Sequence, residues 1–165
     1  MERLLILSDT HLSDDEALPA AVVDLAKDCD HILHAGDVTT PGALAKIKAL
    51  GPLTAACGNM DHVALAGVLP EVAEVTVGGV HIGVIHGWGR PQGIVQRILP
   101  KVQGRGFDVV IYGHSHQPDI SGAEGILFIN PGSPTDRRGA PYHSAGILEV
   151  SDGEVVDARI VDIGR

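Results

Sequence analysis

Side chains that bind divalent metal ions recur along this sequence in short segments that also contain glycine or serine. The segments read Ser-Asp-Thr-His, Gly-Asp, Gly-Asn, Ile-His-Gly and Gly-His-Ser-His. Carboxylates, imidazoles and carboxamides are the groups that hold such ions in proteins. The candidate metal ligands are Asp9, His11, Asp37, Asn59, His86, His114 and His116.

Each of these segments follows a short apolar run, and such runs predict buried strands. In the first half we expect strands at Leu4–Leu7, Ile32–Ala35 and Leu53–Cys57, with helices over residues 14–28 and 41–50 between them. This β-α-β-α-β order favours a parallel sheet with right-handed crossovers.

The second half predicts a β-hairpin, a helix and further strands. The hairpin joins Val72–Val77 to Val80–Ile85 through Gly78-Gly79, a dipeptide typical of tight hairpin turns. We expect a helix over residues 91–103 and strands at Val109–Tyr112, Ile126–Ile129, Ala145–Val150 and Val155–Val161. The whole chain, residues 1–165, is expected to form one α/β domain, either a mixed sheet or two packed sheets with helices outside.

All the candidate ligands therefore lie just beyond the carboxyl ends of predicted strands. That edge is where open α/β sheets bind ligands. Asp9 and His11 are two residues apart, as are His114 and His116, and in extended backbone both members of such a pair would point to one ion. Seven ligands exceed the four or so of a tetrahedral zinc site. We therefore predict two ions that share a bridging carboxylate, the usual arrangement for phosphoester hydrolysis.

The donor set also restricts which metal is expected. Mixed imidazole, carboxylate and amide ligands favour Mn²⁺ as the first choice, with Fe, Zn²⁺ and Ni²⁺ as alternatives, over Ca²⁺ or Mg²⁺. Taken singly, some ligands have another explanation: Asp37 could cap a helix that starts at Pro41, and Asn59 could be a turn residue. Five such segments at one sheet edge favour the metal site.

The ordered motifs DTH (9–11), GD (36–37), GN (58–59), H (86) and GHSH (113–116) resemble the calcineurin-like metallophosphoesterase superfamily. The segment INPGSP at 129–134 resembles its small bacterial and archaeal phosphodiesterase branch. The resemblance implies a four-layer α/β/β/α sandwich with mixed sheets and a phosphodiesterase or phosphatase activity. In it a water or hydroxide activated by two metal ions would attack the phosphorus.

Carried over residue by residue, the resemblance implies a role for each candidate. Asp37 would bridge the two ions, and the remaining six would divide into a first-ion set (Asp9, His11, His116) and a second-ion set (Asn59, His86, His114). One position departs from the family pattern, because Met60 stands where the family has a histidine that assists the leaving group. Besides Asn59, we name Asp61 and His62 as candidate catalytic residues.

Several other residues are candidates with a weaker signal. Arg137 or Arg138 could contact a substrate phosphate, or both could form a solvated surface pair. Trp88 could stack on a substrate, cover the site or pack on a neighbouring subunit. We expect the remaining histidines, His31, His34, His81 and His143, to be structural.

Composition limits the partners and the compartment. A net charge of −9 argues against stable nucleic-acid binding, so we expect a small phosphoester substrate instead. The two cysteines form no CxxC motif, and the N-terminal apolar run is too short for a signal peptide or a membrane span, which predicts a cytoplasmic protein. A homodimer is possible in this interpretation. The alternatives to an enzyme are a non-catalytic scaffold of the same fold, similar to the retromer scaffold subunit, and a metal sensor or storage protein.

Overall fold

Two five-stranded sheets pack face to face in the computed structural model, which describes residues 1–165. The first sheet has the order β10-β9-β1-β2-β3 and the second the order β4-β5-β6-β8-β7. The strands of the first sheet are β1 (Glu2–Leu7), β2 (His31–His34), β3 (Leu53–Ala55), β9 (His143–Ser151) and β10 (Glu154–Gly164). Those of the second are β4 (Val72–Val77), β5 (Val80–Ile85), β6 (Val109–Ile111), β7 (Asp119–Ala123) and β8 (Ile126–Asn130).

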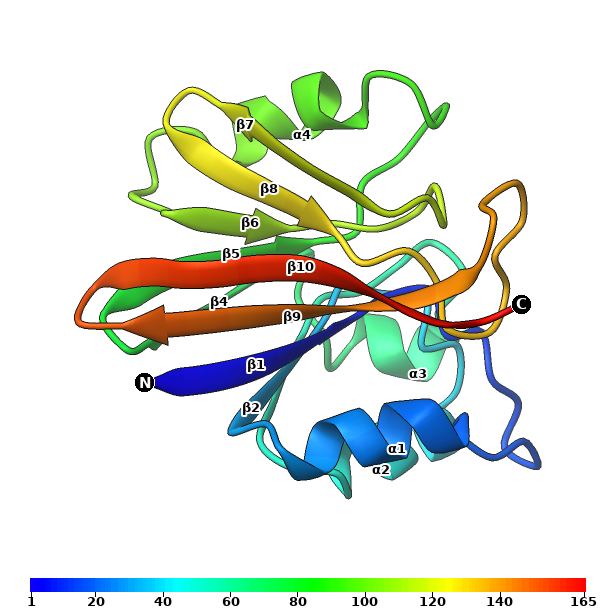
Figure 1. Cartoon of the computed structure of the whole chain (residues 1–165). Coiled ribbons are helices and arrows are strands. Elements are labelled where there is room, and N and C mark those ends of the chain that lie inside the picture. Colours follow the sequence, from blue (N-terminus) through cyan, green and yellow to red (C-terminus); the bar gives the residue numbers. More distant parts are fainter.

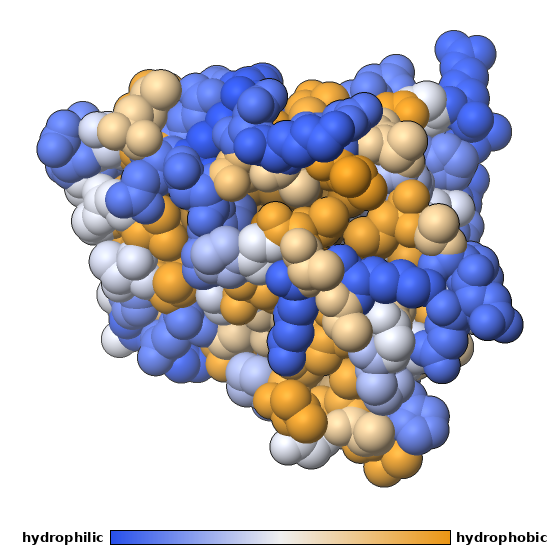
Figure 2. Space-filling model, turned by 90° about the horizontal axis from the view of Figure 1, so that it is seen from below, coloured by the Kyte–Doolittle hydropathy of each residue, from blue (hydrophilic) through white to orange (hydrophobic).

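Helices cover the outer face of each sheet, so the predicted four-layer α/β/β/α sandwich is confirmed (Figure 1). Helices α1 (Ala20–Lys27) and α2 (Pro41–Lys48), with the short α3 (Val63–Ala66), lie on the first sheet, and α4 (Ile94–Val102) lies on the second. The face seen from the side of α1 and α2 mixes hydrophilic and hydrophobic residues (Figure 2). None of the helices has the length and apolar character needed to cross a membrane.

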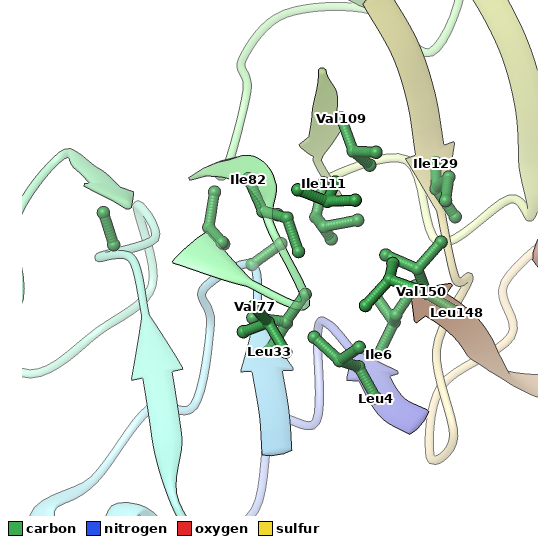
Figure 3. Close-up of a cluster of buried hydrophobic side chains, with 14 of the residues drawn as sticks. Leu4, Ile6, Leu33, Val77, Ile82, Val109, Ile111, Ile129, Leu148 and Val150 are labelled. Atoms are coloured by element: carbon green, nitrogen blue, oxygen red, sulfur yellow. The ribbon is translucent and has the colours of Figure 1, made fainter. Parts of the chain in front are cut away.

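The main core lies between the two sheets (Figure 3). Leu4, Ile6 and Leu33 of the first sheet meet Ile82 and Ile111 of the second. The intervening residues of β1, Leu5 and Leu7, face the helices instead. Both faces of β1 are therefore buried, which explains why it is a continuous apolar run rather than an alternating one. Each such fully buried side chain stabilises the fold by about 1.5–3 kcal/mol.

Both sheets are mixed, and their parallel strands supply the site. Strands β1, β2 and β3 are mutually parallel in the first sheet, and β5, β6 and β8 are parallel in the second. The hairpin between β4 and β5 is confirmed, and Gly78 and Gly79 at its turn have φ of 56° and 81°. Left-handed values at both turn positions are what a two-residue hairpin turn needs.

The structure corrects three element assignments. Helix α1 begins at Ala20 rather than at residue 14, because a residue before proline disfavours helical backbone and Leu18 precedes Pro19. Strand β7 was not predicted, and neither was the four-residue α3. Strand β7 is a mostly exposed edge strand with the sequence DISGA, so it carries no alternating apolar pattern.

Candidate metal centre

The loops that follow β1, β2, β3, β5 and β6 bring all seven predicted ligands into one cluster. His86 Nε2 lies 3.0 Å from Asn59 Oδ1 and 3.3 Å from His114 Nδ1. On the other side of the cluster, His116 Nε2 lies 3.4 Å from Asp9 Oδ1. The first sheet contributes the two aspartates, and the second contributes His86 and both histidines of the Gly-His-Ser-His segment.

Potential ligand atoms form two groups within the cluster. One group is Asp9, His11 and His116, and the other is Asp9, Asp37 and His86; in each, the ligand atoms lie within 4.8 Å of one another. The first group is the set that the family pattern implies for the first ion. Asp37 Oδ2 is 3.3 Å from both His11 Nε2 and His86 Nε2, which places this carboxylate between the two halves.

Three of the histidines are oriented by backbone carbonyls. His86 Nδ1 donates to Ala35 O at 2.7 Å, His114 Nε2 donates to Gly89 O at 2.9 Å, and His116 Nδ1 donates to Asp136 O. A carbonyl oxygen only accepts, so the hydrogen lies on that nitrogen and the opposite ring nitrogen faces the cluster. Metal-binding histidines are held in this way by partners behind them.

Several buried atoms of the cluster lack a hydrogen-bond partner. They are Asp9 Oδ1, His11 Nε2 and His116 Nε2. The second oxygen of Asp9, Oδ2, accepts from Ser8 Oγ at 2.7 Å and from the His114 N–H at 3.0 Å. Burying an unpaired polar atom costs free energy, and a divalent cation would satisfy all three at once. The residues present therefore fit a metal ion.

The ionised carboxylates of the cluster would attract cations. Burial raises the pKa of Asp9, but the imidazoles of His11 and His116 outweigh this effect and hold it well below its usual value. Burial opposes ionisation of Asp37 as well, and His86 together with the Met60 N–H lowers its pKa. Both carboxylates are consequently ionised at neutral pH. In return, Asp9 raises the pKa of His11, so protons would compete with a metal ion for the His11 imidazole.

The backbone at the ligands is left-handed, and the expectation of extended pairs is wrong. The φ values of Asp9, His11, Asp37, His114 and His116 are 55°, 42°, 58°, 73° and 60°. For residues with a Cβ this conformation costs about 1–2 kcal/mol each. It is held by loop hydrogen bonds such as Asp9 N–H to Gly36 O at 2.9 Å. Such strain concentrates at functional sites.

Glycines beside the ligands allow the loops to touch. A Cβ on Gly58 would lie 2.1 Å from Asp37 Oδ1, and a Cβ on Gly113 would lie 2.7 Å from Asp9 Oδ2. On Gly36, a Cβ would come within 2.9 Å of His86 Nδ1. A side chain at any of these positions would clash with a candidate ligand residue.

Asp61 and His62 contact the backbone near the cluster. The Asp61 carboxylate accepts the N–H groups of Gly58 at 2.6 Å, Thr39 at 2.7 Å and Asp37 at 3.3 Å. The exposed His62 accepts the Ala64 N–H at 3.1 Å and caps α3. Asp61 thus positions the loops that carry Asp37 and Asn59. The catalytic roles named for Asn59, Asp61 and His62 stay predictions.

Supporting residues outside the motifs complete the site. Ser133 Oγ donates to Asp9 O at 2.7 Å, and Thr135 Oγ1 donates to Thr10 O at 2.5 Å. Ser133 lies within the NPGSP segment, and Thr135 directly follows it. His34 is fully buried; it accepts the Gly36 N–H at 3.1 Å and lies 3.2 Å from Thr10 Oγ1. It therefore ties two ligand loops together.

This chain is similar in sequence or in fold to several known proteins. A probable metallophosphoesterase of Methanothermobacter thermautotrophicus is 38% identical over 161 residues, which cover 96% of this chain and 91% of that protein. Vps29 of Entamoeba histolytica, solved with Zn²⁺, has a TM-score of 0.72 and 22% identity over 97% of this chain and 98% of that one. A structure described as a novel archaeal phosphodiesterase has a TM-score of 0.70 and 22% identity over 96% of this chain and 99% of that one.

The two solved structures share the two-sheet sandwich fold of this chain. The model of the calcineurin-like phosphoesterase superfamily domain matches residues 2–153, and the chain belongs to this superfamily.

Proposed function

We propose that this chain is a metal-dependent phosphodiesterase with a dinuclear centre. The observation that carries the proposal is the complete cluster, in which buried Asp9, His11 and His116 atoms lack any other partner. Family membership supports hydrolysis of a phosphoester, and the structural likeness to an archaeal phosphodiesterase supports the diester. Divalent ions bound there would supply Lewis-acid activation of water and of the phosphate.

The residues of the chain have separate tasks in this proposal. Asp9, His11 and His116 would hold one cation, and Asn59, His86 and His114 would hold the other. Asp37, within 3.3 Å of both His11 and His86, would contribute its carboxylate to the centre. The backbone carbonyls behind the histidines fix the ring orientations. The mixed nitrogen and oxygen donors favour Mn²⁺.

Charge explains how an acidic protein would attract an anionic substrate. Two divalent cations with Asp9 and Asp37 leave about +2 at the site, in a chain whose net charge is −9. Met60 offers no proton to a leaving group, and its side chain is exposed. Diesters whose leaving groups need no protonation should therefore react best.

The test compares an aryl phosphodiester with its monoester, using protein stripped by a chelator and resupplied with Mn²⁺. We expect metal-dependent turnover with preference for the diester, and loss of at least 100-fold in Asp37→Asn. Asp24→Asn, on the exposed face of α1, is the matched control and should retain full activity.

Three other results would contradict parts of this proposal. Preference for the monoester would replace the phosphodiesterase assignment with a phosphatase. Two bound ions per chain without turnover of either substrate would contradict the enzyme and favour a scaffold. Full activity in Asp37→Asn would contradict the dinuclear centre.

A further inference from the structure

The loop between β5 and α4, residues 86–93, contains the candidate ligand His86 and also orients a second one, His114. The carbonyl oxygen of Gly89 in this loop accepts a hydrogen bond from His114 Nε2 at 2.9 Å. The other ring nitrogen, Nδ1, is thereby left to face His86 Nε2 at 3.3 Å. The position of the Gly89 carbonyl therefore decides which nitrogen of His114 is presented to the cluster.

This loop has little conformational preference of its own. Gly87 and Gly89 have φ of 92° and 84°, and glycine populates left-handed and right-handed backbone about equally. Trp88, between them, is 40% exposed and belongs to none of the apolar cores. The course of the loop must therefore be fixed by contacts from another element.

Arg97 of α4 supplies these contacts through its whole guanidinium group. Its Nε donates to Trp88 O at 2.8 Å, its Nη1 donates to Gln92 O at 2.9 Å, and its Nη2 donates to Arg90 O. Gly89 lies between two of these anchored residues, and a Cβ on Gly89 would come within 2.9 Å of Arg97 Nε. The guanidinium thus holds the backbone on both sides of the carbonyl that orients His114.

A second cation of α4 contacts the same loop. Lys101 is one helical turn beyond Arg97, on the same face of the helix, and its Nζ lies 5.6 Å from the centre of the Trp88 ring. Arg97 is the fourth residue of α4, and a cation near the N-terminus of a helix is unfavourable in the field of the helix dipole. The Arg97 side chain therefore stabilises the loop rather than α4 itself.

We propose that Arg97 is a positioning residue of the candidate metal centre. By fixing residues 88–92 it holds Gly89 O behind the His114 ring, so that Nδ1 faces the cluster. The ligand role of His114 rests on the proposed function, whereas the orientation of its ring does not. Partners that orient a ligating histidine typically change metal affinity 10- to 100-fold when they are removed. The first-ion set is reached through other loops and does not depend on Arg97.

The test follows the His114 ring by nuclear magnetic resonance in metal-free protein at about pH 8, where an ordinary histidine is neutral. Wild type should carry the hydrogen on Nε2, and Arg97→Gln should show a mixture of the Nε2–H and Nδ1–H forms. Calorimetric titration with Mn²⁺ should show one of two ions bound about 10-fold more weakly in Arg97→Gln and the other unchanged. Arg97→Lys, with one ammonium in place of the fork, should be intermediate in both measurements, and it serves as the test variant if Arg97→Gln does not fold.

Arg90→Gln is the matched control, because it removes the same charge from the same loop while only the backbone carbonyl of Arg90 contacts Arg97. It should keep the wild-type ring form and both ion affinities. The inference would be overturned by a wild-type His114 ring and affinities in Arg97→Gln, by equal effects in Arg90→Gln, or by equal weakening of both ions. A His114 ring form that depends on Arg97 in a protein that binds a single ion would support the positioning role and count against the dinuclear centre alone.

Discussion

His34 and His86 are buried close together, but their ring nitrogens have different partners. Both nitrogens of His34 face non-ligand groups, the Gly36 N–H and the Thr10 hydroxyl. His86 has one nitrogen on the Ala35 carbonyl and turns the other towards Asn59, Asp37 and His114. Residue type alone does not distinguish a structural histidine from a candidate ligand, whereas the partners of the two ring nitrogens do.

His34 gives the protein a specific sensitivity to acid. Burial lowers its pKa to about 4, below the value of about 6.5 expected in the unfolded chain. The stability that it contributes is therefore complete above about pH 6.5 and is lost as the pH falls towards 4, by about 3 kcal/mol. Urea unfolding of chelator-treated protein at a series of pH values should show a steeper loss for wild type than for His34→Gln. Parallel curves for the two proteins would contradict this role.

Met60 occupies the position at which the family pattern has a leaving-group histidine. Its side chain is 58% exposed and its N–H donates to Asp37 Oδ1 at 2.8 Å, so an imidazole fits there without repacking. Met60→His should raise kcat/KM at least 10-fold for diesters with poor, alkyl leaving groups and change it little for aryl ones. Equal rates for Met60→His and wild type on alkyl diesters would show that leaving-group protonation does not limit turnover.

The sequence predicted that the candidate ligands lie together, but it did not predict their backbone conformation. Residue types and their positions after apolar runs were enough to collect Asp9, His11 and the other ligands at one edge. The left-handed φ angles at five of them came from loop contacts such as Asp9 N–H to Gly36 O, which join distant segments. No local pattern in the sequence encodes those contacts.

At the scale of elements, regular segments with buried faces were predictable and exposed edges were not. Strands β4 and β5 match their predicted limits because a Gly-Gly turn joins two runs of β-branched residues. Strand β7 has no such pattern and exists because its backbone pairs with β8. The loop after β8 was recognised only as a motif, although Ser133 and Thr135 hold the ligand loop of β1.

The close contact between the loops after β2 and β3 can be tested by adding a single Cβ atom at Gly58. Gly58→Ala places a Cβ 2.1 Å from Asp37 Oδ1 and 2.3 Å from Asp37 N, so we expect loss of at least one metal ion per chain and about 1–3 kcal/mol lower stability. Gly67→Ala, at the end of α3 with no atom within 4 Å of the new Cβ, should match wild type in both. Metal analysis and urea unfolding measure the two effects. Wild-type metal content in Gly58→Ala would contradict the packing described.

At the scale of the whole molecule, the candidate centre joins the two sheets. Asp9, Asp37 and Asn59 follow strands of the first sheet, whereas His86 and His114 follow strands of the second. The ions would therefore add a link between layers that already meet through the apolar core and through hydrogen bonds such as His86 Nδ1 to Ala35 O. Folding and metal binding should be coupled.

Metal binding is expected to raise the melting temperature. At a free Mn²⁺ concentration 100 times Kd, the native state gains about 2.7 kcal/mol for each independent ion, and each kcal/mol shifts Tm by about 2–4 °C in a chain of this size. The Tm values measured by scanning calorimetry with Mn²⁺ and with a chelator should thus differ by about 5–10 °C for each bound ion. Asp37→Asn should show a smaller difference between these two Tm values. A wild-type Tm that is the same with Mn²⁺ and with a chelator would contradict the coupling.

The central claim is that one chain holds two ions that share the Asp37 carboxylate. Electron paramagnetic resonance during titration of chelator-stripped protein with Mn²⁺ tests it most directly, because two bridged ions give a spin-coupled signal. The account predicts saturation at two ions per chain with that coupled signal, and its loss in Asp37→Asn. Saturation at one ion per chain, or two ions without coupling, would contradict the dinuclear centre.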